Sequence, residues 1–113
     1  MNKNVFKLAG LLSLFFAGSS FATTLYLTNQ TKVHAKATIY YGACSTDRDK
    51  DIAPGETLKI GAGLCLVTQI AASMYVPGRD MPATAKPYTS IGTGYRTFAI
   101  IQNYDGSFAV IRP

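Results

Sequence analysis

Apolar and polar residues alternate most strictly over residues 33–41. The two sets of positions are Val33, Ala35, Ala37, Ile39 and Tyr41, and His34, Lys36, Thr38 and Tyr40. A period of two over this length predicts a β-strand with one buried face. A shorter alternating run at residues 25–28 predicts another strand before it. Because residues 29–32 between them are polar, we expect a hairpin, or one strand broken by a bulge.

Three more alternating segments predict strands, at residues 57–60, 95–103 and 107–112. The last two are separated by a short stretch with Asp105-Gly106, a dipeptide typical of tight β-hairpin turns. Residues 42–55 contain five consecutive charged residues and end in Pro54-Gly55, so they are predicted to form a loop.

Two segments are harder to interpret. Residues 64–76 carry no charge and are apolar on both faces, which is typical of a central strand buried on both sides. A buried helix over residues 67–75 would look the same, and the β-rich surroundings favour the strand. Prolines and glycines interrupt residues 77–94, which are predicted to form one long loop. The whole pattern predicts an all-β fold, a small antiparallel sandwich or partly open barrel of about six strands.

The first 22 residues have the pattern of a secretory signal peptide. Lys3 and Lys7 precede an apolar run at residues 8–18, and small residues follow it before Thr23. The apolar run is shorter than the roughly 20 residues that a membrane-spanning helix needs. We therefore expect cleavage after Ala22, a single domain over residues 23–113, a secreted or periplasmic location, and no stable membrane insertion after cleavage.

Composition and charge narrow the class of protein. The chain is 48% hydrophobic and 15% charged, which excludes a disordered protein. Removing Lys3 and Lys7 with the signal segment leaves nine basic and six acidic residues, a net charge of +3. The basic residues are spread along the chain rather than clustered, so we expect no nucleic-acid binding. A modest attraction to anionic cell-surface polymers is compatible with this charge.

The two cysteines, Cys44 and Cys65, are predicted to form one structural disulfide. An exported chain enters an oxidising compartment, and the cysteines are too far apart in sequence for a C-x-x-C redox motif. Closing a loop of this length would stabilise the fold by roughly 3 kcal/mol.

No set of residues predicts catalysis or a cofactor. His34 is the only histidine, so a metal site built on several histidines is excluded. The run Asp47-x-Asp49-x-Asp51 resembles the start of a calcium loop, but Ile52 and Leu58 occupy positions that need Gly and Glu. No nucleophile motif such as G-x-S-x-G is present, and we expect neither an enzyme nor a bound cofactor.

The chain has seven tyrosines, a residue type favoured at interfaces. We therefore expect a binding or interaction module whose partner is a protein or a cell-surface polymer. By elimination, the long loop and its flank are the predicted binding site, with candidate residues Arg79, Tyr88, Tyr95 and Arg96. The alternative is a subunit of a pilus-like surface assembly joined by strand addition. A small hydrolase and a membrane-active toxin are further alternatives.

Overall fold

A computed structural model describes residues 23–113 of the chain, so the predicted signal segment lies outside the described residues. Over residues 23–113 the chain forms nine β-strands in two sheets, and no helix. The four-stranded sheet has the order β4 (Thr57–Gly61), β1 (Thr24–Asn29), β8 (Thr97–Gln102), β9 (Phe108–Ile111). The five-stranded sheet contains β3 (Asp47–Ile52), β2 (His34–Tyr41), β5 (Val67–Tyr75), and both β6 (Ala83–Thr84) and β7 (Tyr88–Thr93) along β5.

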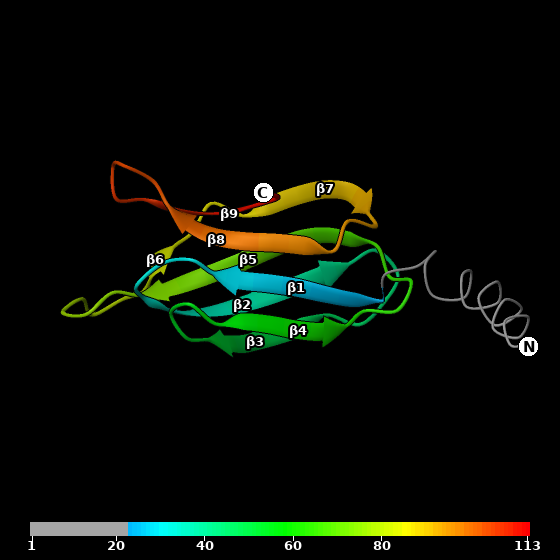
Figure 1. Ribbon diagram of the computed structural model, residues 1–113, viewed down its shortest axis with the longest axis horizontal. Coiled ribbons are helices and arrows are strands. Elements are labelled where there is room, and N and C mark those ends of the chain that lie inside the picture. Colours follow the sequence, from blue (N-terminus) through cyan, green and yellow to red (C-terminus); the bar gives the residue numbers. More distant parts are fainter. Residues whose placement is uncertain (1–22) are drawn as a thin grey trace, which may run out of the picture.

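The predicted all-β sandwich is confirmed, with more strands than the six expected. All strand pairs are antiparallel except β1 with β8, which run parallel. Figure 1 shows the two sheets stacked, with β1 drawn over β2. The alternation at residues 33–41 places its apolar set in the core between the sheets. Buried side chains from both sheets meet there, among them Leu25, Leu27, Ile39, Ile70, Met74, Phe98 and Ile100.

One side of the sandwich is closed and the other is open. The backbone N–H of Lys86, between β6 and β7, donates to the carbonyl of Phe108 at 2.8 Å, and Val110 N–H donates to the carbonyl of Lys86 at 2.8 Å. These bonds cover the free edge of β9 and join the two sheets along it. On the opposite side β3 and β4 are the edge strands of their sheets. The fold therefore combines a sandwich with the partial closure of a barrel.

The predicted hairpin between the first two strands is wrong, and so is the alternative of one strand broken by a bulge, because β1 and β2 lie in different sheets. The turn between them crosses the sandwich and is held by Asn29, whose side chain is completely buried. Its amide nitrogen donates to the carbonyls of Val33 (2.8 Å) and Ile52 (3.0 Å). Its side-chain oxygen accepts the N–H and the hydroxyl of Thr31, at 3.0 and 2.7 Å. These bonds fix the crossing and tie both sheets together at one point.

Two predicted loops are partly strands. Residues 42–55 are not one loop, because β3 (Asp47–Ile52) pairs with β2. Because β3 is an edge strand, it needs few apolar residues, and its run of charged residues lacks the alternation that would have predicted a strand. Residues 77–94 are not one loop either, because β6 and β7 both pair with β5. Pro77, Pro82 and Pro87 all lie outside the strands, in keeping with the missing N–H that disfavours proline within a ladder.

The segment 64–76 contains a strand, as favoured, over β5 (Val67–Tyr75). The expectation that both of its faces are buried is wrong. Val67, Ile70, Ala72 and Met74 are buried, whereas the residues between them are partly exposed. The outward face was predicted to be buried because its residues, among them Ala71 and Ser73, are small or uncharged.

The predicted disulfide is confirmed. Cys44 and Cys65 are bonded, with their Cα atoms 6.0 Å apart, and they link the β2–β3 connection to the β4–β5 connection. Beside the disulfide, Gly42 N–H donates to the carbonyl of Leu66 at 3.0 Å. A disulfide is compatible with an extracellular or periplasmic location. The described residues include no helix long and apolar enough to cross a membrane.

Candidate functional site

A hollow of about 150 Å³ lies on the outward face of the five-stranded sheet, away from the core. Four strands line it: β2, β3, β5 and β6. The lining residues are Lys36, Thr38, Tyr40, Asp49, Ala71, Ala72, Ser73, Tyr75 and Thr84. We call this hollow and the row of side chains around it the groove.

The groove follows from the pairing of β2 with β5. The alternation of β2 turns Lys36, Thr38 and Tyr40 outward, because the residues between them are buried. In register, Lys36 lies opposite Ser73 and Thr38 lies opposite Ala71. The small side chains of Ala71 and Ser73 on β5 therefore lie beside the side chains of Thr38 and Lys36 on β2, and they form the floor of the hollow.

A β-bulge brings a carboxylate to the groove. The register of β3 shifts by one residue between Ala37 and Ile39 of β2, and Asp49 has a φ of 48°, in the left-handed region. Its backbone N–H donates to the hydroxyl of Thr38 at 3.2 Å. Bulges commonly re-aim a side chain next to a functional site, and aspartate tolerates this backbone conformation.

Asp47, on the other side of the bulge, lies beside Tyr41 and not in the groove. The Tyr41 hydroxyl donates to the carboxylate of Asp47 at 2.8 Å. Burial, this hydrogen bond and the charge of Asp47 together raise the pKa of Tyr41 well above its ordinary value. Asp51 instead lies 3.3 Å from Nε2 of His34. The three aspartates of the calcium-like run therefore have separate environments, and over residues 23–113 no cluster of three or more potential metal ligands is found.

The groove carries one cationic and one anionic side chain, Lys36 and Asp49, whose formal charges cancel. Three hydroxyl side chains, those of Thr38, Ser73 and Thr84, also line the groove and can both donate and accept hydrogen bonds. Tyr75 is 42% exposed. The surface therefore offers polar groups of every kind together with aromatic rings.

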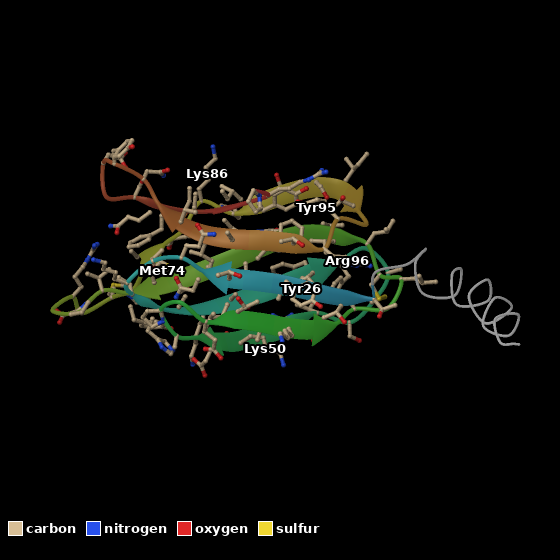
Figure 2. The ribbon with its side chains drawn as sticks, in the orientation of Figure 1. Tyr26, Lys50, Met74, Lys86, Tyr95 and Arg96 are labelled. Atoms are coloured by element: carbon tan, nitrogen blue, oxygen red, sulfur yellow. A yellow bond between two sulfur atoms is a disulfide. The ribbon has the colours of Figure 1, made fainter. Side chains whose placement is uncertain are left out.

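The structure does not gather the four predicted binding residues into one cluster. Arg79 is exposed in the connection between β5 and β6, which projects at the opposite end of the molecule from the β7–β8 connection (Figure 1). Tyr95 and Arg96 lie near the end where β8 begins (Figure 2). Their role in binding remains a prediction.

Three of these residues have structural contacts. The rings of Tyr88 and Tyr95 pack on Phe98, with centroids 4.9 and 5.6 Å from its ring. The guanidinium of Arg112 lies 3.8 Å from the centre of the Tyr95 ring. Arg96 is buried, and its guanidinium donates to the carbonyl of Gly63 at 3.0 Å.

Sequence reasoning missed the groove itself. The outward placement of Lys36, Thr38 and Tyr40 was readable from the alternation. The contributions of Ser73 and Tyr75 depend on the register between β2 and β5, which no local pattern contains. Asp49 depends on a bulge in a strand that its charges concealed.

The chain matches no protein-family model, no curated protein and no solved structure.

Proposed function

We propose that this chain is an exported binding module that holds its ligand in the groove on the outward face of the five-stranded sheet. The observation that carries the proposal is the groove itself. A cation, an anion, three hydroxyls and two tyrosines converge on a hollow in a sheet whose other face is the core. The signal-like N-terminal segment and the disulfide support export.

The groove residues stand on rigid elements. β2 is paired on both edges, by β3 and β5, and β5 is paired on both edges as well. Side chains on such strands are positioned more accurately than side chains on loops, which favours selective binding.

The strand-addition alternative needs a free sheet edge. β1 lies between β4 and β8, and β2 lies between β3 and β5, so both edges of each strand are already paired. The edge strand β3 carries a bulge, and Lys50 lies opposite Ala37 on the face that turns toward the core. Bulges and inward-pointing charges are devices that discourage edge-to-edge pairing. No observation on these strands favours the assembly over the binding module.

The experiment measures how strongly cell-envelope material from the organism that makes the protein retains the purified mature chain, and compares the wild type with two variants. Ser73→Tyr places a large ring in the groove without touching the core. Thr97→Tyr makes a similar change on the exposed outward face of the other sheet and is the matched control. We expect Ser73→Tyr to reduce retention at least tenfold and Thr97→Tyr to leave it unchanged, with equal unfolding midpoints showing that both variants are folded. Equal retention of the two variants would refute the proposal.

A further inference from the structure

We infer that the ligand of the groove is a neutral, hydroxyl-rich saccharide chain. This inference rests on the proposed function and adds the chemical class of the ligand. It is carried by the shape of the groove, by the balance of its charges and by the placement of its tyrosines.

The groove is elongated along the strands. Tyr75 lies opposite His34 near the start of β2, and Tyr40 lies opposite Gln69 near its end. At about 3.3 Å per residue, the six-residue step from His34 to Tyr40 corresponds to roughly 20 Å. The tyrosines therefore mark the two ends of a long, shallow surface, with the hollow between them. A linear chain of linked rings matches this shape better than one compact small molecule.

The groove's polar groups match those of a sugar. Sugar hydroxyls both donate and accept hydrogen bonds, as do the hydroxyls of Thr38, Ser73 and Thr84. The Lys36 ammonium donates hydrogen bonds and the Asp49 carboxylate accepts them, so the groove offers sugar hydroxyls a charged donor and a charged acceptor. A tyrosine ring provides an apolar face with a polar tip, which suits the C–H face and the hydroxyl rim of a sugar ring.

The charge of the groove argues against an anionic polymer. The formal charges of Lys36 and Asp49 cancel. His34, just beyond the groove, already faces the carboxylate of Asp51 at 3.3 Å. Binding of a polyanion relies on an excess of cations along its path, which this face lacks.

A peptide ligand is also disfavoured by geometry. A peptide that adds to a sheet takes its main-chain hydrogen bonds from a free edge. The groove lies on the face of the sheet, between β2 and β5, whose pairing runs the length of the groove from His34–Tyr75 to Tyr41–Val67. Only side chains are left to recognise the ligand, as in the binding of a polyol.

The test measures binding of soluble oligosaccharides to the mature chain by isothermal titration calorimetry. The neutral probes are linear oligomers of glucose, mannose and N-acetylglucosamine, and the comparison probes are polygalacturonate, heparin and a mixed peptide library. We expect at least one neutral oligomer to bind, with an affinity that is unchanged between 0.05 and 0.5 M salt. Binding of a polyanion releases counterions, so its affinity would instead fall by about one power of the salt concentration for each charged contact. Tyr40→Ala and Tyr75→Ala should each weaken that binding at least tenfold.

Tyr26→Ala is the matched control, because Tyr26 is 39% exposed on the outward face of the other sheet, against 42% for Tyr75. An unchanged affinity in this variant is expected. Binding only to the polyanions or the peptides, no binding to any neutral oligomer, or an equal loss in Tyr26→Ala would overturn the inference. If Ser73→Tyr still abolishes retention on the envelope in that case, the binding module stands and only the ligand class is wrong.

Discussion

Replacing Asn29 with alanine should destabilise the fold more than any other polar substitution on the β1–β2 crossing. The Asn29 side chain makes four hydrogen bonds, two donated to the carbonyls of Val33 and Ile52 and two accepted from Thr31. It is completely buried, so water cannot replace these partners without opening the turn. The carbonyl of Ile52 belongs to the five-stranded sheet and Asn29 to the four-stranded sheet, so the substitution removes a hydrogen bond that joins the two sheets at this end.

The expected magnitude follows from these bonds. At a net contribution of about 0.5–1.5 kcal/mol each, four hydrogen bonds amount to about 2–6 kcal/mol. The Thr31 hydroxyl already lies 3.1 Å from the carbonyl of Val33 and can keep that partner in the variant, which offsets part of the loss. We therefore expect Asn29→Ala to lower the free energy of unfolding by about 3 kcal/mol, a large part of the roughly 5–15 kcal/mol that a domain has.

Urea denaturation of the oxidised mature chain, followed by far-ultraviolet circular dichroism, measures this difference. The midpoint should fall while the slope stays unchanged, since a changed slope would report an altered unfolded or native state. Asn103→Ala is the control, because Asn103 is exposed and its amide makes one hydrogen bond, to Ser107 at 3.0 Å. The control should lose less than about 1 kcal/mol. A loss of under about 1 kcal/mol in Asn29→Ala would refute the claim that this amide holds the crossing.

Three further predictions concern the disulfide, the processing and the alkaline stability of the chain. Cys44→Ser and Cys65→Ser should each cost roughly 2–5 kcal/mol, and an Ellman titration of the denatured wild type should find no free thiol; two free thiols per chain would contradict this. The intact mass of the exported protein should correspond to a chain that begins at Thr23, and a membrane-bound species that keeps residues 1–22 would contradict it. Burial raises the pKa of the Tyr41 hydroxyl in the folded state. The stability that the neutral hydroxyl contributes is therefore complete below the unfolded-state pKa of about 10, and it is lost as pH rises through the folded-state pKa. Tyr41→Phe should therefore be less sensitive to alkaline unfolding than the wild type, and identical alkaline transitions would argue against the raised pKa.

Local patterns predicted the strand with the strictest alternation and the hairpin near the C-terminal end of the chain. The alternation at residues 33–41 corresponds to β2 (His34–Tyr41), and the Asp105-Gly106 turn joins β8 to β9 as expected. The disulfide followed from the number of cysteines and the predicted signal peptide. These features depend on neighbouring residues or on composition, so one sequence contains them.

Features that depend on distant partners were not predictable in this way. The parallel pairing of β1 with β8 and the crossing of the chain at Asn29 arise from tertiary contacts. β3 was missed because an edge strand with a bulge needs no alternation, and β7 because it follows a proline-rich stretch. The groove combines two such difficulties, since it needs the register of β2 with β5 and the bulge at Asp49.

The most direct test of the proposed binding site is a map of the amides that respond to the ligand. The mature chain, labelled with ¹⁵N, is titrated with the neutral oligosaccharide or the envelope fraction that retains it, and amide chemical shifts are followed by NMR. The groove predicts that the largest shifts fall on Lys36, Thr38 and Tyr40 of β2 and on Ala71 and Ser73 of β5. Shifts concentrated instead on Arg79, Tyr88, Tyr95 and Arg96, with the outward face of β2 and β5 unmoved, would contradict the account.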